Sequence, residues 1–78
     1  MRLYISIGKK WILAAEGEAT RYYPEVGQRL GINYLDEGSR RYYITSPIGW
    51  IGKDDEDNWN ARTVTGTLYK LVVDGKEI

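Results

Sequence analysis

Hydrophobic and polar positions alternate with a period of two at the start of the chain. Leu3, Ile5 and Ile7 alternate with more polar residues, which is typical of a β-strand with one buried face. Residues 8–10 (Gly-Lys-Lys) predict a tight turn, because glycine readily adopts the positive φ that hairpin turns need. Residues 11–14 are all apolar and predict a second strand, either covered on both faces or in contact with another subunit.

The alternation resumes after an ambiguous stretch. Residues 15–20 favour helix by composition, but Gly17 interrupts them, so we expect a loop with at most one helical turn. Residues 24–27 predict a turn, and residues 28–36 predict a third strand. One face of this strand is expected to carry Leu30, Ile32 and Tyr34, and the other Gly31, Asn33 and Leu35. Residues 36–39 are polar and predict a hairpin loop.

Residues 40–51 are the densest run of aromatic and β-branched side chains in the chain. Such side chains fit a pleated, half-buried surface. We interpret this run as a central strand that turns a corner at Pro47 and continues beyond it. Tyr42 and Ile44 are expected on one face of this strand, and Tyr43 and Thr45 on the other.

The rest of the chain predicts two further strands, at residues 61–65 and 67–73, after a charged loop at residues 53–58. Residues 76–78 follow an Asp-Gly turn signal and could form a short edge strand. Five or six short strands with turn signals between them predict an all-β fold. The expected architecture is a small antiparallel barrel or sandwich, in the size class of SH3-like and OB-like folds. Because no repeat or linker is visible, residues 1–78 are expected to form a single β domain.

The chain has 78 residues, and a domain of this size buries too little surface to be more than marginally stable alone. It has no cysteine and no histidine. Disulfides are therefore excluded, together with thiolate and imidazole metal sites, and the commonest general base is missing. Because the usual means of stabilising a small chain are absent, we expect a homo-oligomer.

Charge and hydropathy narrow the range of partners. Eleven basic and eleven acidic side chains give a formal net charge of zero, which disfavours a protein whose affinity comes mainly from neutralising phosphates. Nucleic acid is therefore a less favoured partner. No apolar run is long enough to span a membrane, and no signal peptide is visible, so we expect a soluble, cytoplasmic protein that does not bind membranes.

The acidic run invites a calcium interpretation, which fails at two diagnostic positions. With Asp54 as the first ligand of an EF-hand loop, the glycine of position six is replaced by Trp59 and the glutamate of position twelve by Thr65. The serines and threonines have no histidine or cysteine to activate them. No phosphate-binding glycine loop is present either. We therefore predict no metal, no cofactor and no catalytic residue, and the protein is not expected to be an enzyme.

A binding surface is the better hypothesis. Arginine side chains with aromatic rings nearby suit phosphate-bearing ligands whose bases can stack. The predicted ligand-binding residues are Arg40, Arg41, Tyr43, Trp50, Trp59 and Arg62. They would come together if the strand formed by residues 40–51 paired with the strand after Trp59. The simpler alternative is that the rings of Tyr42, Tyr43 and Trp50 belong to the core, where large apolar side chains usually lie.

The second half of the chain resembles a pattern found in small bacteriophage and prophage proteins. In that pattern, a strand ending in Thr-Ser-Pro-aliphatic, here Thr45-Ser46-Pro47-Ile48, is followed by Thr-x-x-Gly-x-x-Tyr-x-Leu, here residues 63–71. The resemblance covers about thirty residues and supplies no functional residue. It implies a small oligomeric accessory protein of phage type, located in the host cytoplasm.

Three functions remain open at this point. The first is a non-enzymatic, anti-defence binding protein of phage type that inhibits a host process by binding a host protein or by sequestering a small nucleotide signal. The second is an SH3-like or OB-like nucleic-acid-binding module that uses the same residues. The third is a structural subunit of an oligomeric assembly, in which the aromatic rings form the contacts between subunits.

Overall fold

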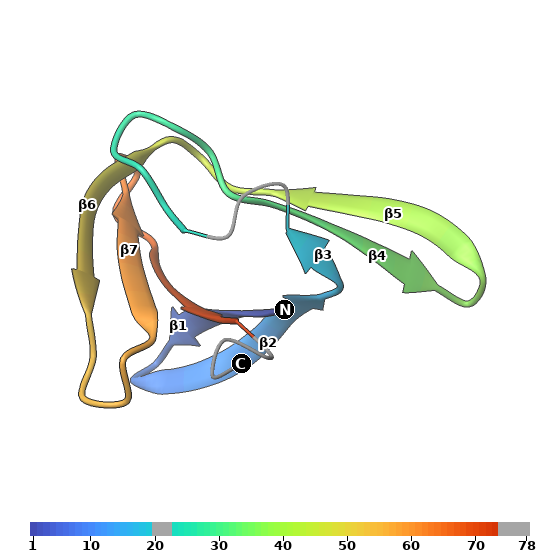
Figure 1. Cartoon of the computed structure of the whole chain (residues 1–78), viewed down its shortest axis with the longest axis horizontal. Coiled ribbons are helices and arrows are strands. Elements are labelled where there is room, and N and C mark those ends of the chain that lie inside the picture. The colour runs from blue at the N-terminus through green and yellow to red at the C-terminus, as the bar shows by residue number, and fades with distance from the viewer. Residues whose placement is uncertain (20–22, 74–78) are drawn as a thin grey trace.

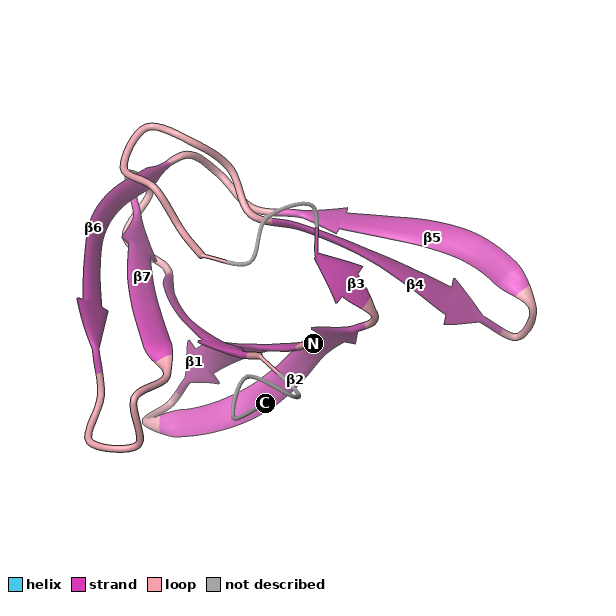
Figure 2. Cartoon of the chain, viewed as in Figure 1, coloured by secondary structure: helices cyan, strands magenta, loops and turns pink. Residues whose placement is uncertain are grey.

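The computed structural model describes residues 1–19 and 23–73, which form β-strands and no helix (Figure 2). The strands are β1 (Arg2–Ile7), β2 (Lys10–Glu16), β3 (Glu18–Ala19), β4 (Gly31–Asp36), β5 (Ser39–Ile44), β6 (Ile48–Lys53), β7 (Trp59–Thr63) and β8 (Leu68–Val72). The all-β prediction is confirmed. Within the described residues the number of strands is eight rather than five or six, because residues 40–51 form two strands and the expected loop at residues 15–20 contains β3. The short strand expected at residues 76–78 lies outside the described residues.

The strands form two antiparallel sheets. The larger sheet has the order β2-β1-β8-β7-β6, and the smaller has the order β3-β4-β5. The larger sheet is not closed into a barrel, and β2 and β6 are its two edges. Figure 1 shows that this sheet is strongly curved, so that β6 and β7 stand at a steep angle to β1 and β2. The β4–β5 hairpin lies over the concave side and extends beyond it.

Residues 40–51 turn a corner as expected, but they do not form a central strand. They are divided between β5, at the edge of the smaller sheet, and β6, at the edge of the larger one. At the corner, Thr45 N–H donates to Leu30 O at 2.9 Å and Ile48 N–H donates to Gln28 O at 2.8 Å. Pro47 lies between these two bonds and has no N–H, which makes it suitable for a break between strands.

The turns follow the sequence signals. Gly8 (φ 59°) and Lys9 (φ 68°) both have positive φ and connect β1 to β2 as a two-residue hairpin turn. Glu37 (φ 52°) and Gly38 (φ 83°) connect β4 to β5 in the same way. Gln28 N–H donates to Glu25 O at 3.1 Å in the turn after Pro24. These three predicted turns are confirmed.

The core lies between the concave side of the larger sheet and the β4–β5 hairpin. Its buried side chains are Leu3, Ala15, Leu30, Ile32, Ile48, Ala61, Tyr69 and Leu71. Thr45 is also buried, and its Oγ1 accepts the N–H of Leu30 at 3.0 Å. Since neighbouring residues of a strand point to opposite faces, the residues that alternate with this core form the outward face of the larger sheet. No helix suited to crossing a membrane occurs in residues 1–19 and 23–73.

Candidate functional site

The outward face of the larger sheet carries a mixture of aromatic and basic side chains. Strand register places these residues: Tyr4 lies opposite Leu13 on one side and Lys70 on the other, Lys70 lies opposite Asn60, and Arg62 lies opposite Trp50. Residues directly opposite each other in an antiparallel pair share a face. The outward face therefore includes Arg2, Tyr4, Trp11, Leu13, Trp50, Asn60, Arg62 and Lys70.

Lys70 lies between two aromatic rings on this face. Its Nζ is 5.0 Å from the centroid of the Trp11 ring and 5.4 Å from that of Tyr4. Both distances lie within the range of a cation–π interaction. The Arg2 Nη1 reaches the Tyr4 hydroxyl at 3.4 Å. Three strands, β1, β2 and β8, thus contribute to one cluster of rings and cations.

Trp50 and Arg62 form a second pair on the same face. Trp50 is 52% exposed although tryptophan is usually well buried. Its ring lies over Gly52, where a Cβ would approach the Cη2 of Trp50 to 2.7 Å. Gly52 therefore leaves room for the ring to lie along the strand. Among the described residues, Arg62 forms no ion pair, and its guanidinium is exposed.

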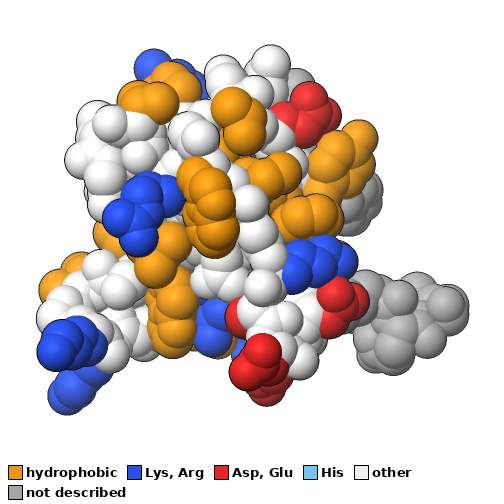
Figure 3. Space-filling model, turned by 90° about the vertical axis from the view of Figure 1, so that its left-hand side faces the viewer, with side chains coloured by type: hydrophobic (Ala, Val, Ile, Leu, Met, Phe, Trp, Pro, Cys, Tyr) orange, Lys and Arg blue, Asp and Glu red, His pale blue; other side chains and the backbone are white. Residues whose placement is uncertain are grey.

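Figure 3 looks at the side of the molecule that carries β6 and β7. Hydrophobic side chains form a band down this side, with Lys and Arg side chains beside the band. Asp and Glu side chains gather mainly toward its lower end. Basic and acidic groups also meet in the β6–β7 region, where the Lys53 Nζ lies 3.1 Å from the Asp57 Oδ1.

The acidic loop between β6 and β7 is held by its own hydrogen bonds. The Asp54 Oδ1 accepts the N–H groups of Glu56 (3.0 Å) and Asn58 (2.9 Å). Burial opposes the charged form of Asp54, but these bonds, together with one from the Asn60 side chain, outweigh it and lower the pKa of the carboxyl. Within the part of the chain that the structure describes, no group of three or more acidic side chains is arranged to hold a metal ion.

Two of the predicted ligand-binding residues face the core rather than solvent. Tyr43 is half-buried; its hydroxyl is 3.0 Å from that of Tyr69, and the two rings meet edge to face with centroids 6.3 Å apart. Trp59 is half-buried on the concave side opposite Leu71, and the Lys53 Nζ lies 4.5 Å from its ring centroid. The alternative in which these rings belong to the core is therefore correct for Tyr43 but not for Trp50, which is exposed.

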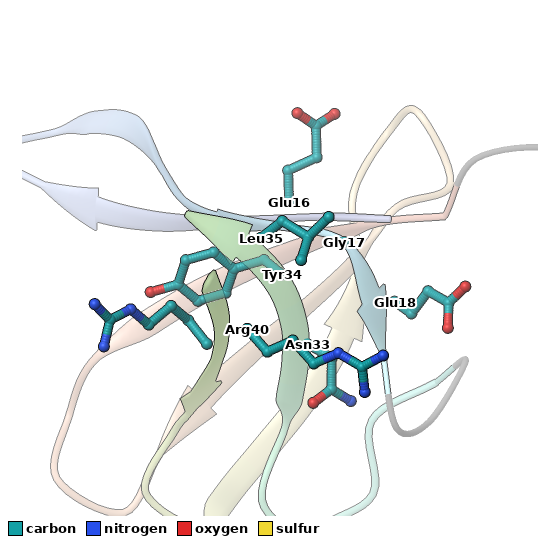
Figure 4. Close-up of a pocket in the computed structure, with 8 residues that line it drawn as sticks. Glu16, Gly17, Glu18, Asn33, Tyr34, Leu35 and Arg40 are labelled. Atoms are coloured by element: carbon teal, nitrogen blue, oxygen red, sulfur yellow. The ribbon is translucent and has the colours of Figure 1, made fainter. Parts of the chain in front are cut away.

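Arg40 and Arg41 lie on the β4–β5 hairpin, because β5 pairs with β4, whereas β7 pairs with β6 and β8. The expected pairing therefore brings Trp50 to Arg62 but leaves these two arginines on the other sheet. They line a pocket of about 790 Å³ together with Glu16, Gly17, Glu18, Asn33, Tyr34 and Leu35. Figure 4 shows Arg40 beside Asn33, while Glu16 and Glu18 point away from it. The Arg41 Nε is 3.9 Å from the Asp36 Oδ2, and both side chains are exposed, so this contact is weak.

The sequence did not single out Tyr4, Trp11 and Lys70. The alternation of residues 3–7 already placed Tyr4 on the face opposite Leu3 and Ile5, which was a usable signal for an outward ring. Lys70 gave no such signal, because its position between Tyr4 and Trp11 depends on the pairing of the first strand with the last.

Comparison with known proteins finds no family model, no curated protein and no solved structure that matches this chain.

Proposed function

We propose that this protein is a non-enzymatic binding protein that holds single-stranded nucleic acid on the outward face of its larger sheet. The observation that carries the proposal is the cluster of Lys70 between the rings of Trp11 and Tyr4, with Trp50 and Arg62 on the same exposed face. Bases stack on aromatic rings, and cations beside the rings contact the phosphates.

The shape of this face favours an extended strand over a single nucleotide. Binding sites for small molecules are usually concave and enclose most of the ligand. The outward face instead presents its rings on three strands of one sheet, β1, β2 and β6, and sheets that stack successive bases of a single strand also carry their rings on the sheet surface. The pocket at Arg40 is concave, but its lining is balanced in charge, because Glu16 and Glu18 contribute to it as well as Arg40 and Arg41.

The SH3-like or OB-like interpretation of the fold belongs to the same proposal. The curvature of the five-stranded sheet supports it, since OB-folds are five-stranded, partly open barrels that bind oligonucleotides on one sheet face.

The test is fluorescence anisotropy with labelled DNA and RNA oligonucleotides at low salt. Loss of one stacking ring is worth about 1–3 kcal/mol, so Trp50→Ala and Trp11→Ala should each weaken binding by about 5- to 150-fold. If Arg2, Arg62 and Lys70 each contact one phosphate, log K should fall with log salt with a slope of about −2.

Arg40→Ala is the matched control for Arg62→Ala, because both remove an exposed arginine from a strand. Arg62→Ala should weaken binding and reduce the salt slope, and Arg40→Ala should do neither. No binding to any oligonucleotide at low salt, or equal effects of the two substitutions, would refute the proposal.

A second candidate function is supported by a different surface. The solvent side of the β4–β5 hairpin carries three exposed apolar side chains, Leu35, Tyr42 and Ile44. Exposed apolar patches often bind protein partners. This agrees with the phage-type accessory protein that blocks a host defence by binding a host protein.

The second candidate is tested in bacteria that carry an active defence system. Expression of the protein should restore plaques of a phage that the defence excludes. Leu35→Arg should abolish this rescue, whereas Val64→Arg, at a similarly exposed apolar residue elsewhere, should preserve it. Absence of rescue by the unmodified protein across defence systems would remove this candidate.

A further inference from the structure

The two edges of the larger sheet differ in how well they are protected. At the β6 edge, Ile48 exchanges backbone hydrogen bonds with Gly27 and Gln28, and the pairing is irregular at Gly49. Bulges and coverage of this kind prevent pairing with other chains. At the β2 edge, no described strand pairs with the outer side of residues 10–14. β2 contacts β4 at the C-terminal end of β2, where the following residue, Gly17, lies against Asn33.

The unprotected part of β2 is also the most apolar. Trp11 is 39% exposed, Ile12 46% and Leu13 47%. Trp11 and Leu13 lie on the outward face, and Ile12 lies on the concave face, opposite Ile5. An apolar edge strand exposed on both faces is a template for pairing with another strand.

The hairpin turn determines which backbone groups are available. In a two-residue turn, the flanking residues, here Ile7 and Lys10, form a hydrogen-bonded pair. Hydrogen-bonded and non-hydrogen-bonded pairs alternate along an antiparallel ladder. The backbone groups of Lys10 and Ile12 therefore point toward β1, and those of Trp11 and Leu13 point toward the open edge.

We propose that two copies of this chain associate through antiparallel pairing of β2 with β2, centred on Ile12. In this register, Trp11 of each copy lies opposite Leu13 of the second copy, and the two exchange the backbone hydrogen bonds that point outward. Ile12 lies opposite Ile12 of the second copy as a non-hydrogen-bonded pair, in which side chains approach most closely. The two larger sheets become one continuous sheet. This inference does not depend on the proposed ligand.

The charges at the two ends of β2 disfavour parallel pairing. Lys10 begins the strand and Glu16 ends it. In the antiparallel register Lys10 lies opposite Ala14 of the second copy, whereas in-register parallel pairing would place Lys10 opposite Lys10 and Glu16 opposite Glu16, and like charges directly opposite each other are destabilising. A two-fold axis through Ile12 also closes the assembly, because each edge uses itself as its complement.

The first test is the mass of the full chain by analytical ultracentrifugation. The protein should sediment with about twice the chain mass of 9.0 kDa. Ile12→Lys places two like charges opposite each other at the two-fold axis and should produce monomers, with circular dichroism to show that the chain stays folded. Val64→Lys is the control, because Val64 is an apolar residue exposed elsewhere, and it should remain dimeric.

The second test detects the register directly and uses the absence of native cysteine. In Ile12→Cys, the two thiols should form a disulfide quickly under mild oxidation, because the Cα atoms of such a pair are about 4.5 Å apart. In Leu13→Cys, the two thiols are offset by about 7 Å along the strands and should cross-link much more slowly. Val64→Cys should not cross-link.

Each outcome decides the proposal. A monomer at every concentration would overturn it. A dimer in which Ile12→Cys cross-links no faster than Leu13→Cys would overturn the register, and a dimer unaffected by Ile12→Lys would place the interface elsewhere. Oligonucleotide binding by the monomeric Ile12→Lys variant would leave the proposed function intact even if dimerisation fails.

Discussion

Gly17 lies against the backbone of β4, and replacing it should push β4 away. A Cβ on Gly17 would overlap the carbonyl oxygen of Asn33, and it would lie 2.9 Å from the carbonyl carbon of Asn33 and 3.1 Å from the Cα of Tyr34. All three atoms belong to the backbone of β4. No side-chain rotation relieves the clash, so Gly17→Ala must shift β4 away from the bend between β2 and β3.

Gly31→Ala is the matched substitution. A Cβ on Gly31 would also overlap another residue, but this is the end of the Tyr42 ring. Tyr42 is about half exposed, so its ring has space to rotate. Alanine also reduces the conformational freedom of the unfolded chain, which stabilises by about 0.4–1 kcal/mol where the backbone tolerates it. The same chemical change therefore meets rigid backbone at one site and a movable side chain at the other.

The expected losses of stability follow from this difference between the two glycines. Overpacking against fixed atoms costs about 1–3 kcal/mol, which in a domain of this size lowers Tm by about 5–20 °C. With a urea m-value of about 1 kcal/mol/M, the midpoint for Gly17→Ala should fall by about 1–3 M. Gly31→Ala should stay within about 1 kcal/mol of the unmodified protein.

Urea unfolding followed by tryptophan fluorescence and by circular dichroism measures both variants. Coincident transitions in the two signals license the two-state analysis. Equal stability of the two variants, or a Gly17→Ala variant as stable as the unmodified protein, would show that the contact between the β2–β3 bend and β4 yields easily. The reasoning about rigid approach would then be wrong.

Other contacts give predictions of the same kind. Thr45→Val should cost about 1–3 kcal/mol in urea unfolding, because it leaves the buried N–H of Leu30 without its acceptor. Phe substitutions at Tyr43 and Tyr69, singly and together, should show a coupling of about 1 kcal/mol in a double-mutant cycle. Burial, and then the hydrogen bond with Tyr43, raises the pKa of Tyr69. The stability that the protonated Tyr69 hydroxyl contributes is therefore complete below the unfolded pKa of about 10 and is lost as the pH rises above that value. Tyr69→Phe should diminish this loss in thermal melts at alkaline pH. The lowered pKa of Asp54 contributes stability that is present above the model-peptide value of 3.8 and is lost as pH falls through the folded value, so Asp54→Asn should weaken the acid-side decline.

Local patterns in the sequence predicted most of the strands and, for the first of them, the side that it buries. The alternation of residues 3–7 placed Leu3 and Ile5 on one face, and Leu3 is fully buried. Glycine and polar turn signals gave the hairpin turns, because positive φ is a property of the residue itself. Strand order was not predictable in this way. β8 lies between β1 and β7, and apolar alternation does not specify which strand is the neighbour.

The site residues were likewise predicted correctly where their placement depends on consecutive strands, and not where it depends on the order of strands in the sheets. Trp50 and Arg62 were brought together because β6 and β7 are consecutive and pair as a hairpin. Arg40 and Arg41 were misplaced because residues 40–51 were treated as one strand, whereas the corner at Pro47 transfers the chain to another sheet. Lys70 and Trp11 are far apart in sequence, and only the pairing of β1 with both β2 and β8 makes them neighbours.

Because the formal net charge of the chain is zero, it would attract a polyanion only weakly from a distance. The same balance does not prevent the chain from binding a polyanion once the two are in contact. Eleven acidic and eleven basic groups cancel at a distance, and charges beyond about 8 Å are screened at physiological salt. A strand would therefore sense Arg62 and Lys70 only after it has nearly reached the outward face. Asp54 accepts hydrogen bonds from its own loop and lies near enough to Lys70 for the two charges to interact, and Glu16 lies opposite Arg2 in the pairing of β1 with β2. Acidic groups therefore lie beside the cations on both sides of the outward face, so the rings of Trp11, Tyr4 and Trp50 would supply most of the affinity for a bound strand.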